Sequence, residues 1–119
     1  MYGFDVKVQG SFDDAVSRVT EELKKEGFGV LTEIDVAATL KNKLGVEKAP
    51  YKILGACNPG FANKAIEAEP DIGLLLPCNV VVRQVEDGIV VSFMDPAAVL
   101  GMVNRKEVEQ LGGEVRERL

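Results

Sequence analysis

The stretch NVVVRQVEDGIVVSFMD, residues 79–95, carries the clearest structural signal in the sequence. Two apolar runs, 79–85 and 89–95, flank the dipeptide Asp87-Gly88. Asp-Gly favours a two-residue hairpin turn, because glycine accepts a positive φ angle without steric penalty. The pattern predicts two antiparallel strands joined by a tight turn, and it makes an antiparallel sheet the frame of the fold.

Three more segments have strand patterns. Residues 4–8 and 28–35 place apolar side chains or threonine at even positions and mostly polar ones at odd positions, which is typical of strands with one buried and one polar face. We expect these two strands to pair with each other. Residues 51–57 have little polar content and are predicted to lie centrally in the sheet. The small residues Gly55 and Ala56 indicate that another backbone or a ligand comes close.

Helical patterns separate the strands. Residues 11–26 repeat apolar side chains every three or four positions, with Ser11 placed to cap the first turn and Gly27 to end the helix in a left-handed conformation. Asp35 and Gly45 bracket a second, shorter helix in the same way.

A third helix begins at Asn58 and Pro59 and is interrupted at 69–71. Its buried side is predicted to hold Phe61, Ala62, Ala65 and Ile66. Further helices are expected at 97–103 and in the tail, where a glycine pair, Gly112-Gly113, interrupts an apolar stripe. The stripe consists of Val108, Leu111, Val115 and Leu119.

Composition limits the classes of protein that fit. The 119 residues suit one domain, 1–119, with 14 basic and 19 acidic residues and a net charge of −5. The missing basic footprint argues against nucleic acid as a partner. Histidine is absent, which excludes Ser–His–Asp and Cys–His catalysis. Without a secretory signal or an apolar run of roughly 20 residues, we expect a cytoplasmic protein that does not enter the membrane.

Together these segments predict a two-layer α+β fold. An antiparallel-rich sheet of about five strands would carry the helices on one face, because a sheet with one apolar face must bury it against another layer.

The two cysteines are the first candidates for chemistry. Cys57 ends a strand directly before the helix start at Asn58, where free amides and the helix dipole would lower the pKa of a thiol. Cys78 lies at the start of another strand, which can be a neighbour of the strand that ends at Cys57. The interpretation that we favour is that both are small buried packing residues. A metal site with two thiolates would be incomplete, so no metal is assigned.

Polar residues give three weaker candidates. The helix start after Asn58 can hold a phosphate or carboxylate, with Lys64 about two turns on, but a plain helix cap is the simpler interpretation. An acidic set near strand ends, Glu33, Asp35 and Asp95, would bind a divalent cation if its carboxylates converged. Helix caps and a polar sheet face explain this set better.

A polar sheet face away from the helices is the last candidate. This face would be exposed to solvent, or it would serve as a dimer or ligand surface. Its polar content argues against a large interface that excludes water. Its expected members are Asp5, Lys7 and Glu33.

Several short motifs, in a fixed order, resemble one known family. They are GFGVLTEIDVAATLKNKLG (27–45), LGACNP (54–59), IGLLLPCNVVV (72–82), the Asp-Gly hairpin and MDP (94–96). In this order and spacing they are similar to the bacterial and archaeal domain of unknown function 302 family. The resemblance implies a two-layer α+β fold like that of the TATA-binding protein, and a dimer. It implies no activity, no catalytic residues and no DNA binding, because function belongs to sites and not to folds.

Three functional hypotheses follow, and none of them identifies a cofactor. The leading hypothesis is a non-enzymatic, homodimeric module that binds a small ligand or a partner protein, since no acid–base or nucleophile set stands out. The alternative is a thiol- or metal-dependent activity centred on Cys57 and Cys78, with Asn58 and Asp95 nearby. A structural subunit of a larger complex would instead show a conspicuous exposed apolar patch.

Overall fold

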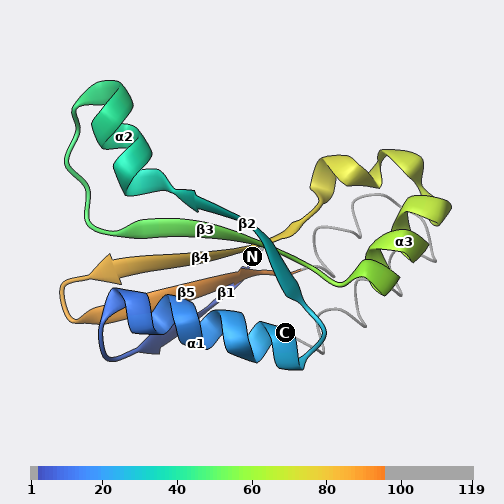
Figure 1. The fold of residues 1–119 in the computed structure, drawn as a ribbon, viewed down its shortest axis with the longest axis horizontal. Coiled ribbons are helices and arrows are strands. Elements are labelled where there is room, and N and C mark those ends of the chain that lie inside the picture. Colours follow the sequence, from blue (N-terminus) through green and yellow to red (C-terminus); the bar gives the residue numbers. More distant parts are fainter. Residues whose placement is uncertain (1–2, 96–119) are drawn as a thin grey trace.

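The computed structural model describes residues 3–95, which form five strands, three α-helices and one 3-10 helix (Figure 1). In chain order these are β1 (Gly3–Val8), α1 (Phe12–Lys25), β2 (Gly29–Asp35), α2 (Val36–Leu44), β3 (Tyr51–Cys57), α3 (Pro59–Ala68), η1 (Pro70–Leu75), β4 (Cys78–Val85) and β5 (Gly88–Met94). The helices expected at 97–103 and in the tail lie outside the described residues.

The strands form one antiparallel sheet in the order β1-β5-β4-β3-β2. The α+β fold with a five-stranded sheet is therefore confirmed. The helix α1 lies over one face of the sheet, whereas α2 and α3 extend beyond its opposite ends (Figure 1). Within residues 3–95, no helix is both long enough and apolar enough to cross a lipid bilayer.

The predicted hairpin is present as β4 and β5, but its turn is shifted by one residue. Val85 pairs with Gly88, so the two turn residues are Glu86 and Asp87 and not Asp87 and Gly88. A side chain at Gly88 would begin only 3.0 Å from the carbonyl oxygen of Val8. Glycine is favoured here because its φ angle of 155° is one that other residues rarely adopt, and because the neighbouring strand β1 comes this close.

The predicted pairing of the first two strands is wrong. β1 lies at one edge beside β5, and β2 lies at the other edge beside β3. The chain crosses the sheet through α1 between them, and alternation within a strand identifies its faces but not its partner. The interior position of β3 is confirmed, although the middle strand is β4.

The second correction is a β-bulge in β2. Val30 pairs with Ala56, but the next pair is Thr32 with Gly55, so Leu31 is the extra residue. A bulge reverses the alternation beyond it. The residues from Thr32 onward therefore exchange faces relative to the predicted pattern. Glu33, for example, pairs with buried Leu54 and lies on the α1 side.

The core lies between α1 and the sheet. From the sheet it takes alternate residues of three strands, and from α1 it takes Ala15 and Leu23. Full burial of one such Val or Leu side chain stabilises the fold by about 1.5–3 kcal/mol. The helix itself is as predicted, because the Ser11 side chain accepts a hydrogen bond from the Asp14 amide at 3.1 Å and Gly27 takes a φ angle of 86°. The sheet residues of this core are Leu54, Ala56, Cys78, Val80, Val82, Ile89 and Val91.

A smaller cluster joins α3 to η1. Ala65 and Ile72 are buried there, with Phe61 packed against them. Ile66, predicted on the buried side of the third helix, is instead 46% exposed, because η1 packs on the side of α3 that holds Ala65 and the next residue lies about 100° around the helix axis.

Candidate functional site

The four residues singled out from the sequence come to the same end of the sheet. β3 and β5 both run antiparallel to β4. The end of β3 at Cys57 and Asn58, the start of β4 at Cys78, and the residue after β5, Asp95, are therefore neighbours along that end. The topology brings the set together although the residues span 39 positions of sequence.

The two cysteines occupy different faces of this end. Ala56 pairs with Cys78, so the next residue, Cys57, belongs to the opposite face of β3. Burial and the nearby Cys57 sulfur raise the pKa of Cys78 to about 11, and burial also raises the pKa of Cys57. These directions are opposite to the lowering that an activated thiol needs, so both thiols are protonated at neutral pH.

Asn58 acts as a helix cap and as a link between two helices. Its Oδ1 accepts a hydrogen bond from the Phe61 amide at 3.1 Å. Its Nδ2 packs on the turn after α1, where a side chain at Gly27 would begin only 2.9 Å away. The structure thus gives Asn58 a positioning role at the start of α3, and Lys64 lies exposed farther along that helix.

The acidic set does not converge. Asp35 caps α2 by accepting from the Ala38 amide at 2.9 Å, and Glu33 pairs with Lys52 at 2.7 Å. β2 is separated from β5 by two strands, which places it about 14 Å from the strand that precedes Asp95. Among residues 3–95, no group of three or more metal-ligating side chains is placed to hold an ion.

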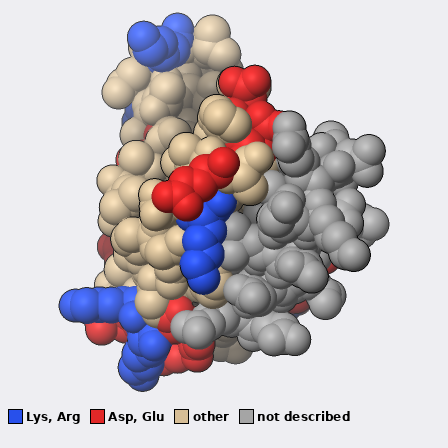
Figure 2. Space-filling model, turned by 90° about the vertical axis from the view of Figure 1, so that its right-hand side faces the viewer, with Lys and Arg blue, Asp and Glu red and all other residues tan. Residues whose placement is uncertain are grey.

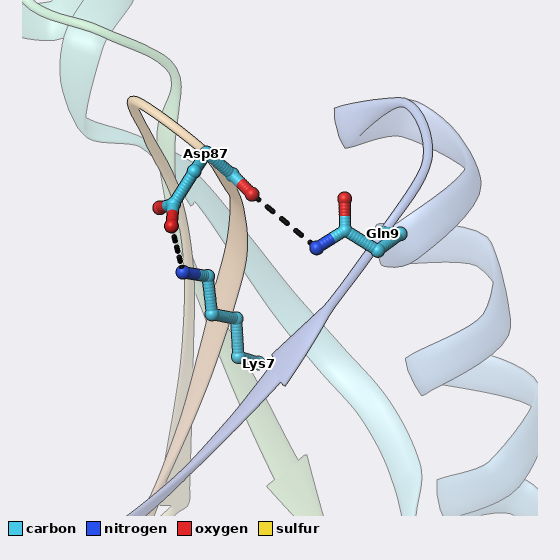
Figure 3. A network of polar contacts seen from close by, with 3 residues as sticks. All are labelled: Lys7, Gln9 and Asp87. Atoms are coloured by element: carbon cyan, nitrogen blue, oxygen red, sulfur yellow. Dashed lines mark hydrogen bonds and ion pairs between the residues drawn. The ribbon is translucent and has the colours of Figure 1, made fainter.

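The expected polar face of Asp5, Lys7 and Glu33 is not formed either, because β1 and β2 lie at opposite edges. Lys7 instead pairs with Asp87, and Gln9 donates to the Asp87 carbonyl at 3.3 Å (Figure 3). These contacts tie β1 to the β4–β5 turn. The Lys7 ammonium lowers the pKa of the Asp87 carboxyl through its hydrogen bond and its charge.

A hollow that the sequence did not reveal lies beside α1, and we call it the α1–β1 pocket. Its volume is about 510 Å³, within the range of small-molecule sites. The floor comes from β1 and β5, and one wall comes from α1. The lining residues are Phe4, Val6, Val8, Arg18, Val19, Glu22, Leu23, Glu26, Val91 and Phe93.

The floor of the α1–β1 pocket is apolar and partly aromatic. The rings of Phe4 and Phe93 stack with centroids 5.3 Å apart. Val6 remains 47% exposed although it lies on the face that α1 covers. The even-position pattern of 4–8 and the apolar stripe of α1 were both visible in the sequence, but the space between them depends on β1 lying beside β5.

A second hollow, of about 310 Å³, lies between α2 and the start of α1. Six of its eleven lining residues are charged, and two of its three lysines are already engaged in ion pairs. Lys41 pairs with Glu47 at 3.3 Å, and Lys52 pairs with Glu33. We therefore regard the α1–β1 pocket as the stronger candidate for binding a ligand.

Figure 2 views the end of the molecule that lies on the right in Figure 1. There the basic and acidic side chains of the described residues are interspersed with uncharged surface, and these residues form no broad basic patch in this view.

Known proteins with a similar sequence or structure support the fold described above. A family model described as Domain of unknown function DUF302 matches residues 4–119. A crystal structure of an uncharacterized conserved DUF302 protein from Bacillus stearothermophilus is similar to this chain, with 30% sequence identity and a TM-score of 0.92. The match covers 99% of this chain and 92% of the other. No curated protein matches the sequence.

Proposed function

The chain belongs to the DUF302 family, and we propose that it is a non-enzymatic, homodimeric module that binds a small ligand in the α1–β1 pocket. The observation that carries the proposal is the pocket itself: a hollow of about 510 Å³ with an apolar floor and a few charged groups at its rim. This combination of an apolar lining and sparse polar groups is characteristic of ligand sites.

The lining supports binding more than catalysis. Its charged members are one arginine and two glutamates, and its other members are apolar. None of the lining side chains is a hydroxyl, a thiol or an amine. The two carboxylates, which can also act as nucleophiles, lie exposed at the rim. The free thiols of Cys57 and Cys78 lie elsewhere, and free thiols suit a reducing cytoplasm, where we propose that the protein acts.

The homodimeric part of the proposal is supported by exposed apolar residues around β2 and α2. No residue of α2 is buried, and a helix of nine residues is marginal without packing. The exposed residues are Leu31, Ile34, Leu44 and Val46. Residues 36–50 carry three lysines and one glutamate, a net charge of +2, while the rest of the chain holds 11 basic and 18 acidic residues, a net charge of −7. Because these charges are opposite, contact between this segment of one copy and the acidic remainder of a second copy is electrostatically favourable.

The alternative proposal is a thiol- or metal-dependent activity centred on Cys57 and Cys78. Its supporting observation is that these residues start and end neighbouring strands at one end of the sheet, with Asn58 and Asp95. The raised pKa values count against it. It requires fast alkylation of both thiols at neutral pH in the native protein, and slow alkylation would remove it.

The ligand-binding proposal is tested with the neutral fluorescent probe N-phenyl-1-naphthylamine. We expect enhanced, blue-shifted emission with the wild-type protein, because the probe leaves water for the apolar floor. Val6→Trp fills the pocket and should weaken binding by about tenfold or more. Asp5→Trp is the matched control, because Asp5 lies on the opposite face of the same strand.

The circular dichroism spectrum shows whether each variant is folded. The proposal fails if the wild-type protein leaves the probe emission unchanged. It also fails if folded Val6→Trp protein binds the probe as tightly as the Asp5→Trp control.

A further inference from the structure

The charges at the rim of the α1–β1 pocket are arranged along one face of α1. Arg18, Glu22 and Glu26 are spaced four residues apart and therefore lie one above another on the helix. They divide the rim into a basic end, at the middle of the helix, and an acidic end, near its last turn.

The basic end of the rim is already engaged. Arg18 Nη2 donates a hydrogen bond to the Gln9 carbonyl at 3.1 Å, which holds the guanidinium against the segment that leads into α1. An anionic ligand would have to compete with this contact. It would also meet two carboxylates from the same helix.

At the acidic end of the rim, negative charge is available to interact with a ligand. Glu26 makes no ion pair with any residue between 3 and 95, and it lies at the C-cap of α1, the negative end of the helix dipole. Glu22 pairs with Lys25 at 3.1 Å, but both side chains are largely exposed. Exposed pairs of this kind contribute little and are readily exchanged. The lining as a whole carries a net charge of −1.

The floor of the pocket is also suited to a positively charged ligand. The stacked pair Phe4 and Phe93 lines the pocket, and the faces of aromatic rings attract cations. The apolar floor also offers surface to a hydrocarbon body. A neutral apolar ligand would use this floor but leave the two carboxylates unused.

We infer that the ligand of the α1–β1 pocket is an organic cation with an apolar body, such as an amine or a quaternary ammonium compound. The apolar body lies on the β1–β5 floor, and the positive group faces Glu22 and Glu26. This inference rests on the proposed ligand-binding function and adds the chemical class of the ligand.

The test compares three probes that share one hydrocarbon chain: decyltrimethylammonium, decanol and decanoate. Calorimetric titration below the micelle concentration should give tightest binding for the cation, weaker binding by about tenfold for the alcohol, and weakest binding for the anion. Added salt should weaken binding of the cation more than binding of the alcohol.

Variants that remove the negative charges of the rim then test whether the preference for the cation arises there. Glu22→Gln combined with Glu26→Gln should reduce the affinity for decyltrimethylammonium to that for decanol and leave decanol binding unchanged. Glu21→Gln is the matched control, because Glu21 lies on the same helix but does not line the pocket. It should leave all three affinities unchanged.

The outcomes separate this inference from the function on which it rests. Equal affinity for the cation and the alcohol, or an unchanged cation affinity in the double variant, overturns the ligand class while the pocket still binds. Failure of all three probes to bind a wild-type protein that does bind N-phenyl-1-naphthylamine also overturns the ligand class, whereas failure of N-phenyl-1-naphthylamine to bind overturns the ligand-binding function itself.

Discussion

Gly55 lies in β3 at a point where the neighbouring side chains leave no room for a methyl group. A Cβ atom there would lie 2.2 Å from Thr32 Oγ1 and 2.9 Å from Pro77 Cγ. Other atoms do come close to Gly55, as the sequence indicated, but they belong to side chains, whereas another backbone or a ligand was expected. Residue size alone signals a close contact without naming the partner.

Gly55→Ala should therefore destabilise the protein by about 1–3 kcal/mol, because the proline ring cannot rotate away as the threonine can. Gly29→Ala is the control, since no other atom lies within 4 Å of its Cβ position. Its free energy of unfolding should change by less than about 0.5 kcal/mol. Urea unfolding measures both, and equal effects of the two variants would contradict this interpretation of β3.

Cys78 gives the stability of the protein a dependence on alkaline pH. Its pKa is raised from an ordinary value of 9.0 to about 11. Below pH 9 the thiol is protonated in both the folded and unfolded states, and its contribution is fully present. Between pH 9 and 11 the unfolded state loses a proton that the folded state keeps, so the free energy of unfolding should fall by about 1.4 kcal/mol per pH unit from this group.

Cys78→Ala should be less stable at neutral pH, because it leaves a small cavity, but it should lose less stability between pH 9 and 11. The difference in slope between the two proteins isolates the thiol from the lysines and tyrosines that titrate in the same range. Parallel slopes would show that Cys78 is not buried as the structure places it.

At the scale of elements, the sequence correctly predicted the features that depend on contacts between residues close together in the chain. Ser11, Asp35 and Asn58 each cap the helix that follows them, as their positions in the sequence indicated. The bulge at Leu31 could not be predicted in this way. The alternation in residues 28–35 continues through it, and only pairing with β3 shows that Thr32 opposes Gly55 and that Glu33 moves to the α1 side.

The bulge also decides one of the candidate sites. Without it, Glu33 would lie on the face away from α1, as the sequence pattern suggested. With it, Glu33 pairs with Lys52, whose pKa is raised by that hydrogen bond. A carboxylate that seemed available for a surface cluster therefore belongs to an ion pair beside α2.

At the scale of the whole molecule, strand order determines which candidate sites exist. The expected pairing of β1 with β2 would have brought Asp5, Lys7 and Glu33 closer together. The observed order puts β1 beside β5 and creates the α1–β1 pocket instead. Strand order depends on contacts between distant segments, so the sequence predicted the cluster at the end of β3 and β4 but not the pocket.

The proposed homodimer is tested by light scattering coupled to gel filtration. The wild-type chain should show twice its mass of 12.9 kDa. Leu44→Glu, on a helix with no buried residue, should leave the fold intact and shift the protein to the monomer mass. Leu74→Glu is the control, because this 88% exposed residue lies on η1 and not around β2 and α2.

A wild-type monomer would contradict the homodimer. A Leu44→Glu dimer would instead contradict the interface around β2 and α2. Neither result would affect the α1–β1 pocket, which belongs to a single chain.

The central claim, that the α1–β1 pocket is where this protein binds its ligand, is tested most directly by NMR. Backbone amide shifts of the labelled protein would be followed while N-phenyl-1-naphthylamine is added. We predict saturable shifts concentrated at Val6, Val19 and Phe93, which line the pocket from β1, α1 and β5. Shifts concentrated in the hollow beside α2 or at the Cys57–Cys78 end of the sheet, or no saturable shifts at all, would contradict it.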